Sequence, residues 1–404
     1  MKNRHVMIIA GEASGDMRAA GLARALKRLD SSLRLSGIGG EHMRRAGVEC
    51  FADITELAVI GIAEVVKNFN RIKKVFRQTL AQIDASRPDA VVLVDYPGFN
   101  LRLAGEIKKR GLKVIYYISP QVWAWRENRI LKIKKLVDRM IVLFPFEKQL
   151  YEKYGMKADY AGHPLAEEII VNHDQTEVLK ALGLSASKTT IGLMPGSRLK
   201  EVERHLPCML EAAKLLYSRN RERQFILLKA SSIPLKLIES IVSSCRMDSA
   251  MTLPDVPLKH APEAMLGPFE ELEHFPLKIY DGNPYDGINA ADAVMVASGT
   301  ATLECALLKK PMVIIYKTSW LTYAVAKTVI KIPYIGLVNV VAGKKIVEEL
   351  LQNDATAKRL SDAMESVLYN HRIIDELAAV KDSLGEPGAS QRAAKVILET
   401  AYPI

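Results

Sequence analysis

Cysteine is scarce in this sequence, and the few cysteines are scattered. The 404 residues include four of them, and none belongs to a C-x-x-C pair. Zinc sites and disulfide frameworks need cysteines at close and regular spacing, so the sequence predicts neither. A reduced, cytoplasmic setting fits this pattern best. The four are Cys50, Cys208, Cys245 and Cys305.

Long uncharged apolar runs are also missing. A membrane-spanning helix needs about 20 consecutive apolar residues. The nearest candidate, residues 318–343, is interrupted by Lys327, Lys331 and Pro333. The apolar run at residues 6–10 is too short for a signal peptide and is soon followed by acidic residues. We therefore expect this run to be a β-strand and the protein not to span a membrane.

Acidic residues are outnumbered by basic ones, which gives the chain a net charge of +10. This charge predicts an anionic partner, and nucleic acid, phospholipid or a phosphorylated substrate would each satisfy it. The sequence has no zinc-finger spacing and no aromatic strand of the RNP type. These absences argue against nucleic acid.

Short β-rich runs alternate with amphipathic helical stretches along most of the chain, which is the pattern of parallel sheets covered by helices. The sequence therefore predicts the α/β class, with two sheets in tandem. The strands expected in the first sheet are residues 5–11, 33–39, 90–95, 113–118, 139–144 and 158–161, and those in the second are 189–194, 224–230, 293–297 and 312–316.

Three segments follow from this pattern. Residues 1–170 and 171–343 should each form a Rossmann-like domain, and residues 344–404, helical by period and charge, should pack back on the domains. The turn at residues 162–164 is the expected hinge, because proline fixes the chain there and the composition then becomes polar. Residues 253–275 look like an irregular excursion.

Ligands of open α/β sheets bind beyond the carboxyl ends of the strands. After the first strand, residues 11–16 (GEASGD) combine small and acidic residues, but they match neither a Walker A loop nor G-x-G-x-x-G. They either meet an anion or a sugar, or form a tight turn in which Ser14 or Asp16 caps a helix. The glycines at 37–40 could line the same cleft or serve the backbone only.

Two further loops of the first half carry candidate chemistry. Asp95 stands at the mouth of an apolar strand, where it could act as a general base or could cap the helix starting near Asn100. The loop containing Gln121 also places Trp123 and Trp125 after a strand. Their rings could stack on a sugar or pack in the core.

The second half has two loops suited to a diphosphate. Arg198 follows a strand that ends in a Pro-Gly turn, and the alternative is a surface arginine lying over apolar side chains. Residues 297–304 (ASGTATLE) form a turn of small and hydroxyl residues onto a helix, in which Glu304 could reach a ribose. Plain helix capping by Ser298 or Thr300 is the alternative.

Residues 62–83 have apolar side chains at helical spacing and a basic flank. An interfacial membrane helix has this pattern, and so does a core-facing helix with a solvated basic side. The basic residues are Lys67, Arg71, Lys74 and Arg77.

Several stretches together resemble the lipid-A-disaccharide synthase family over most of the chain. They occur in the family's order and spacing, which makes chance an improbable cause. The stretches are residues 10–16 (AGEASGD), 37–40 (GIGG), 94–100 (VDYPGFN), 117–125 (YISPQVWAW), 144–147 (FPFE), 162–164 (GHP), 193–198 (LMPGSR), 297–304 (ASGTATLE) and 349–352 (ELLQ).

The resemblance implies a GT-B glycosyltransferase, with two Rossmann-like domains whose parallel sheets face each other across a cleft. It implies an inverting transfer from UDP-2,3-diacylglucosamine to 2,3-diacylglucosamine 1-phosphate without metal or cofactor. Asp95 is then the candidate base. The acceptor side would comprise Gly11, Glu12, Ser14, Gly15, Gly39 and Gln121, and the UDP side Arg198, Ser298, Gly299, Thr300, Ala301, Glu304 and Asn339. Asn339 follows a valine where the family usually has proline.

The same resemblance favours the interfacial interpretation of residues 62–83, because both substrates carry acyl chains. It implies a cytoplasmic protein bound peripherally to the anionic inner face of the inner membrane, and a homodimer is a further possibility. The alternatives are a UDP-N-acetylglucosamine 2-epimerase or a lipid-linked peptidoglycan transferase of the same fold, or a silent scaffold that only binds nucleotide-sugar.

Overall fold

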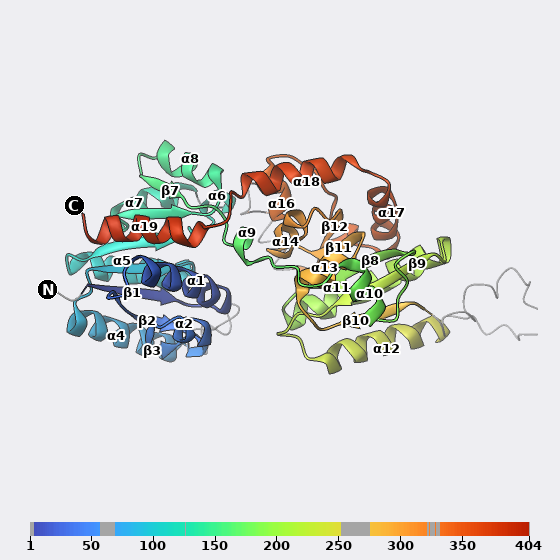
Figure 1. The fold of residues 1–404 in the computed structure, drawn as a ribbon, viewed down its shortest axis with the longest axis horizontal. Helices are drawn as coiled ribbons and strands as arrows, with labels where there is room; N and C mark the ends of the chain where they lie inside the picture. The colour runs from blue at the N-terminus through green and yellow to red at the C-terminus, as the bar shows by residue number, and fades with distance from the viewer. Residues whose placement is uncertain are drawn as a thin grey trace, which may run out of the picture. The chain divides into compact units, whose positions relative to one another are not determined.

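The structure is a computed structural model that describes residues 4–56, 69–125, 127–251, 275–320, 323, 328 and 332–403. The chain divides into two compact units (Figure 1). Unit 1 comprises Met1–Glu167 and Leu384–Ile404, and unit 2 comprises Glu168–Ser383. The chain therefore crosses between the units twice, once a few residues after the turn at 162–164 and once near its C-terminal end.

Unit 1 is built on a seven-stranded sheet in which every neighbouring pair is parallel. Its order is β3-β2-β1-β4-β5-β6-β7, so the direction of the strand order reverses between β1 and β4. The strands are β1 (His5–Ala10), β2 (Arg34–Gly39), β3 (Glu49–Asp53), β4 (Ala90–Val94), β5 (Lys113–Tyr117), β6 (Arg139–Val142) and β7 (Ala158–Tyr160).

Helices cover both faces of this sheet, because its central strands are apolar on both sides. One face packs α4, α5, α7 and α8 on a core that includes Met7, Val91 and Tyr116. On the other face, α19 lies beside α1 and contacts β5 (Figure 1). The helices are α1 (Ala13–Leu29), α2 (Glu41–Arg45), α4 (Phe69–Ser86), α5 (Pro97–Lys109), α6 (Val122–Trp125), α7 (Ile130–Leu136), α8 (Pro145–Lys153), α9 (Leu165–Glu168) and α19 (Ala389–Ala401), with 3₁₀ turns η1 (Ile54–Glu56) and η2 (Glu127–Arg129).

The C-terminal helix is tied to the segment expected to be the hinge. The His163 backbone N–H donates to Leu384 O at 2.8 Å. The Glu167 carboxylate accepts from the Gly388 N–H at 2.7 Å and from the Ser390 N–H at 3.2 Å, at the start of α19. These bonds fix the two chain segments that leave unit 1 next to each other.

Unit 2 repeats this architecture with a six-stranded parallel sheet, in the order β10-β9-β8-β11-β12-β13. Its strand order reverses between β8 and β11. The elements are β8 (Thr189–Met194), β9 (Arg223–Leu228), β10 (Leu277–Tyr280), β11 (Ala293–Ala297), β12 (Met312–Tyr316), β13 (Glu349–Leu351), α10 (Gln175–Ala181), α11 (Leu199–Arg219), α12 (Leu235–Met251), α13 (Pro284–Ala290), α14 (Ala301–Leu307), α16 (Leu337–Ala342), the 3₁₀ turn η5 (Gln352–Asp354), α17 (Ala357–Leu368) and α18 (Arg372–Ser383). The predicted α/β class and two parallel sheets are confirmed.

The segment expected to be helical from residue 344 onward begins differently. Residues 349–351 form strand β13, which pairs in parallel with β12. Leu350 is buried there, so this short segment completes the edge of the sheet instead of extending a helix. The remaining tail is shared between the units, with α17 and α18 in unit 2 and α19 in unit 1. The excursion predicted at 253–275 lies almost wholly outside the described residues.

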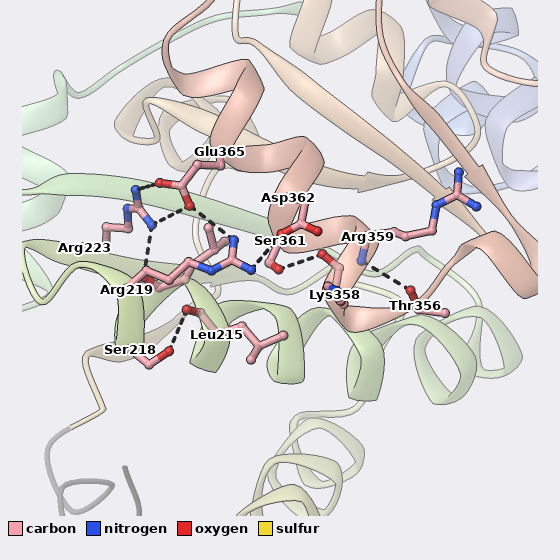
Figure 2. A network of polar contacts seen from close by, with 11 residues as sticks. Leu215, Ser218, Arg219, Arg223, Thr356, Lys358, Arg359, Ser361, Asp362 and Glu365 are labelled. Atoms are coloured by element: carbon pink, nitrogen blue, oxygen red, sulfur yellow. Dashed lines mark hydrogen bonds and ion pairs between the residues drawn. The ribbon is translucent and has the colours of Figure 1, made fainter. Parts of the chain in front are cut away.

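Helix α17 is attached to unit 2 by the network of Figure 2. Arg223, at the first position of β9, is only 2% exposed. Its guanidinium pairs with the Glu365 carboxylate of α17 and donates to Leu216 O at 3.1 Å. Arg219 of α11 reaches Asp362 at 2.7 Å. Burying this guanidinium without its carboxylate would be costly, so the pair holds α17 in place.

The described part of the predicted interfacial helix is α4, while residues 62–68, with Lys67, lie outside the described residues. Val75 and Ile83 are fully buried, and Ile72, Phe76 and Leu80 pack against the same core. Residues 69–86 are therefore a core-facing helix. Their basic side chains Arg71, Lys74 and Arg77 are exposed. Within the described residues, no helix is long and apolar enough to cross a membrane.

Candidate functional site

The strand order of unit 1 reverses between β1 and β4, and the loops after these two strands meet there. In open parallel sheets this point is the usual ligand crevice. Gly11 and Glu12 follow β1, and Asp95 and Tyr96 follow β4. A Cβ atom at Gly11 would collide with the ring of Tyr96. Glycine is therefore needed at position 11 so that the two loops can pack together.

The backbone at Asp95 is held in an unusual conformation. Asp95 and Tyr96 both have positive φ, 49° and 45°. The Asp95 carbonyl accepts from Asn100 Nδ2 at 2.8 Å and from Tyr116 Oη at 2.5 Å, and its N–H donates to Tyr117 O at 3.1 Å. Such strained backbone persists where surrounding bonds enforce it, and it concentrates at functional sites.

The environment of Asp95 raises the pKa of its carboxyl to about 6. Burial is the main cause, the negative charge of Glu12 adds to it, and the Tyr96 N–H opposes it. A carboxylate with this pKa is mostly ionised at neutral pH and is a stronger base than an ordinary aspartate. These properties suit a general base. The alternative, in which Asp95 caps the next helix, is not observed, because α5 begins at Pro97 without a side-chain cap.

Asp95 opens onto a cavity of about 310 Å³ within unit 1. Gln121, predicted on the acceptor side, lines this cavity as well. Arg129 also lines it and was not predicted, because nothing in its local sequence distinguishes it from the other basic residues of this segment. The lining residues are Asp95, Pro97, Ile118, Ser119, Pro120, Gln121, Val122 and Arg129.

A buried carboxyl group supports one wall of this cavity. Glu147 is 2% exposed and accepts from Ser119 Oγ at 2.7 Å and from Trp123 Nε1 at 3.2 Å. Burial raises its pKa to about 7 despite these bonds. The Trp123 ring also packs edge-to-face on Phe146. Trp123 therefore packs within the protein, while the side chain of Trp125 lies outside the described part of the chain.

The remaining acceptor candidates lie around the same switch point. Ser14 and Gly15 belong to the first turn of α1, where Ser14 is exposed and Gly15 is buried. Asp16 does not cap its own helix, since its carboxylate accepts from the N–H groups of Gly40, His42 and Met43 at 2.7–3.1 Å, at the start of α2.

Gly39 precedes this capped turn. A Cβ atom at Gly39 would collide with the Met43 side chain, so the position requires a close approach of α2. The amides that follow β2 are thus bonded to a protein carboxylate, and the structure gives Gly39 a packing role.

In unit 2, a cavity of about 480 Å³ lies at the switch point between β8 and β11. Six predicted donor residues line it: Arg198, Ser298, Gly299, Thr300, Ala301 and Glu304. The sequence did not predict the part of the cavity that is lined by the loops after β9 and β10, because those loops carry no recognisable motif. The other lining residues are Met194, Gly196, Ser197, Glu201, Leu228, Lys229, Ala230, Ser231, Tyr280, Asp281, Gly282, Pro284 and Ala297.

Arg198 has an exposed side chain that reaches Glu201 at 2.7 Å. The loop before Arg198 is bonded to His205, which is fully buried on α11. His205 Nε2 accepts from the Lys317 N–H at 2.9 Å, so its Nδ1–H donates to Pro195 O at 2.8 Å. Burial lowers the pKa of His205, which keeps the ring in the neutral form that this pattern requires.

Asn339 is the predicted donor residue that does not line the cavity. Its side chain is fully buried and donates to Val347 O and Glu349 Oε1 at 2.9 and 2.8 Å. Its Oδ1 accepts from the Ile346 and Val347 N–H groups. Asn339 therefore holds the loop that leads from α16 into β13.

Among the described residues, no group of three or more histidine, cysteine, aspartate or glutamate side chains is placed to hold a metal ion. The polar side chains around the two cavities are carboxylates, guanidinium groups, hydroxyls, the Gln121 amide and the Lys229 ammonium group.

Solved structures identify the fold as GT-B. MnaA from S. aureus with UDP superposes with a TM-score of 0.64 at 11% identity, covering 99% of this chain and 98% of that one. A putative UDP-N-acetylglucosamine 2-epimerase from Listeria monocytogenes gives 0.63 at 13% identity, covering 98% and 96%. The kitacinnamycin glycosyltransferase gives 0.61 at 13% identity, covering 99% and 100%. These likenesses define the class of fold.

The family follows from sequence. The family model described as lipid-A-disaccharide synthetase matches residues 6–256 and 242–395. The lipid-A-disaccharide synthase of Geobacter sulfurreducens is 42% identical over 402 residues, or 98% of this chain and 97% of the relative. Lipid-A-disaccharide synthase 1 of Legionella pneumophila is 40% identical over 389 residues, covering 95% and 94%. The chain belongs to the lipid-A-disaccharide synthase family, as its motifs predicted.

Proposed function

We propose that this protein is an inverting glycosyltransferase. It transfers 2,3-diacylglucosamine from its UDP donor to 2,3-diacylglucosamine 1-phosphate, forming a β-1′,6-linked disaccharide phosphate and UDP. Family membership supports the substrate class. The observation that carries the chemistry is the Asp95 carboxyl, whose pKa is raised to about 6 and which lines a cavity between the loops after β4 and β5.

Asp95 is the general base of this proposal. The acceptor 6-hydroxyl loses its proton to the carboxylate as its oxygen attacks the anomeric carbon of the donor from the face opposite UDP. The C–O bond to UDP breaks in the same step, and the configuration at that carbon is inverted. A base contributes most when its pKa lies near the working pH, and the pKa of Asp95 meets this condition.

The loops around Asp95 form the acceptor side in this proposal. Gln121 lines the same cavity and is assigned to the acceptor sugar. Glu12 acts on the base through its charge, and Gly11 allows the loops after β1 and β4 to meet. We assign Ser14 and Gly15 to the edge of this site and Gly39 to its support.

The cavity of unit 2 is the proposed UDP site. Arg198 is assigned to the diphosphate, because guanidinium groups pair with phosphate oxygens in a bidentate manner. Together with Ser298, Gly299, Thr300 and Ala301 it would stabilise the charge that develops on the leaving group. Glu304 is assigned to the ribose hydroxyls, and Asn339 supports the site through the loop that it holds.

Binding to a membrane surface also belongs to this proposal, because both substrates carry acyl chains. The exposed basic side chains Arg71, Lys74 and Arg77 of α4 are a suitable contact for anionic lipid at the cytoplasmic face of the inner membrane. Their replacement by glutamate should weaken binding to anionic vesicles. A homodimer stays a prediction, which light scattering of the purified protein tests.

The activity is tested by incubating the purified protein with both monosaccharide precursors and analysing the products by mass spectrometry. The tetraacyl disaccharide phosphate and UDP should appear together, and neither should form without acceptor. An epimerised UDP-sugar formed in the absence of acceptor would instead identify a 2-epimerase, and unchanged substrates would reject both activities.

A further inference from the structure

The cavity beside Asp95 is lined by a cationic side chain to which the proposed chemistry assigns no role. Arg129 is the one basic side chain among the described residues that line it. The side chain is partly buried. It lines the same cavity as Asp95, whose backbone carbonyl accepts a hydrogen bond from the Tyr116 hydroxyl. The guanidinium group and the candidate base therefore face one cavity.

Arg129 is also held by its neighbours. It ends the short turn η2, which connects α6 to α7. Two residues earlier, the Glu127 carboxylate accepts from Lys153 Nζ at 3.1 Å and from Tyr154 Oη at 2.9 Å on α8 and the residue after it. Ile130, the next residue, is fully buried. Contacts on both sides thus fix the backbone that carries the guanidinium.

We propose that Arg129 binds the phosphate group of the sugar acceptor and makes the enzyme selective for a phosphorylated acceptor. This inference rests on the proposed function. In a glucosamine 1-phosphate the phosphate and the carbon of the reacting 6-hydroxyl are attached to the two ring carbons that flank the ring oxygen, so both groups can lie in one cavity. The cavity offers matching groups, a basic carboxylate for the hydroxyl and a guanidinium for the phosphate. Arginine is well suited because its fork of N–H donors fits phosphate oxygens.

The size of the cavity agrees with this orientation. At about 310 Å³ it lies at the lower end of small-molecule pockets, which span roughly 300–1,000 Å³. This volume accommodates a sugar phosphate headgroup, whereas two acyl chains have to extend beyond the cavity. With the chains outside, contacts to the phosphate and the sugar decide how the ring is placed, so loss of the guanidinium should be felt mainly in acceptor binding.

The test compares Arg129→Ala with the unchanged protein on two acceptors, 2,3-diacylglucosamine with and without its 1-phosphate. With the phosphorylated acceptor, the variant should lose about 10- to 100-fold in kcat/KM, mostly through KM, as expected for a lost charge-assisted contact. With the dephosphorylated acceptor the two proteins should be equal. The KM for the UDP donor should stay the same.

Lys132→Ala is the matched control, since Lys132 is exposed on α7 and does not line the cavity. Arg129→Lys retains the charge without the fork and should lose part of the selectivity, which keeps the test decisive if the alanine variant does not fold. Equal losses on both acceptors, or no loss on either, would overturn the role of Arg129. Failure of the unchanged protein to form disaccharide would instead reject the proposed function.

Discussion

Units 1 and 2 have the same kind of parallel sheet, and each has a cavity beyond the carboxyl ends of its strands. In unit 2 the cavity spans the point where the strand order reverses, whereas in unit 1 it lies between the loops after β4 and β5. The side chains at the two cavities differ. Unit 1 offers a carboxyl group with a raised pKa, and unit 2 offers Arg198 and a turn of small and hydroxyl residues. The sheet thus supplies the position of a site, while the loops decide whether it suits a nucleophile or a leaving group.

The units also bury charge at different places. In unit 1 the buried carboxyl of Glu147 lies behind the cavity loop, bonded to Ser119 and Trp123. In unit 2 the buried guanidinium of Arg223 lies at the first residue of β9, at the opposite end of the sheet from the cavity. Substitutions in unit 2 can therefore separate stability from ligand binding more cleanly than those in unit 1.

The largest effect on activity is expected for Asp95→Asn. An amide cannot accept the proton from the acceptor hydroxyl, so kcat should fall by roughly 10²- to 10⁴-fold while UDP affinity in unit 2 is retained. Turnover measurements check the fall in kcat, and calorimetric titration with UDP checks the affinity. Glu152→Gln, which alters an exposed carboxylate of α8, is the control. Turnover near that of the unchanged protein in Asp95→Asn would remove Asp95 from the mechanism.

Arg198→Ala, in unit 2, should weaken UDP binding, which Asp95→Asn should leave unchanged. Loss of the guanidinium should lower kcat/KM by roughly 10²- to 10³-fold and weaken UDP binding, because the leaving diphosphate loses its counter-charge. The acid limb of the pH profile, set by Asp95, should not move. Lys200→Ala, an exposed neighbour outside the cavity, serves as the comparison. Unaltered UDP affinity would place the diphosphate elsewhere.

Glu365→Ala should affect stability and leave the sites intact. The substitution leaves the Arg223 guanidinium buried without its carboxylate partner. Since the Glu365 side chain is 33% exposed, we expect the free energy of unfolding to fall by about 3 kcal/mol, the lower end of the range for such pairs. Thermal unfolding checks this value, and UDP affinity of the folded protein should be unchanged. Asp362→Asn, at a more exposed pair of the same network, should cost less than about 1 kcal/mol. Equal losses would argue against the buried pair as the cause.

The smallest effect concerns the pH dependence of unit 1. In the proposed mechanism the ionised form of Asp95 is the base, so kcat/KM should fall as the pH decreases through about 6. Glu12→Gln removes a negative charge that disfavours this ionisation, and should shift the acid limb to lower pH by a fraction of a unit. Glu41→Gln, paired with Arg45, is the control. A limb that does not move would mean that another group sets the profile.

The raised pKa also has a consequence for stability. A carboxyl whose folded-state pKa lies above its unfolded value contributes stability at low pH that is lost as the pH rises through about 6. Asp95→Asn should therefore raise Tm relative to the unchanged protein at pH 8 more than at pH 4.5. Thermal unfolding at the two pH values checks this difference, and an equal change at both would contradict the raised pKa.

Local sequence patterns were sufficient for the class of fold and for much of the candidate site. Apolar runs alternating with amphipathic helices require parallel sheets, and the residues that end such strands gather at one edge of the sheet. Asp95 and Arg198 could therefore be placed at candidate sites from the sequence, and the structure shows that each lines a cavity. The turn at residues 297–304 was found in the same way.

Long-range packing decided the remaining features of the site and the fold, because the contacts of a side chain depend on residues that are distant in the sequence. Asp16 caps α2 and not its own helix, and Asn339 bonds the loop before β13 without lining the cavity of unit 2. The segment Glu349–Leu351 is a strand because β12 has an open edge beside it. Arg129 reaches the cavity of Asp95 only through the folding of α6, η2 and α7, so its local sequence could not reveal it.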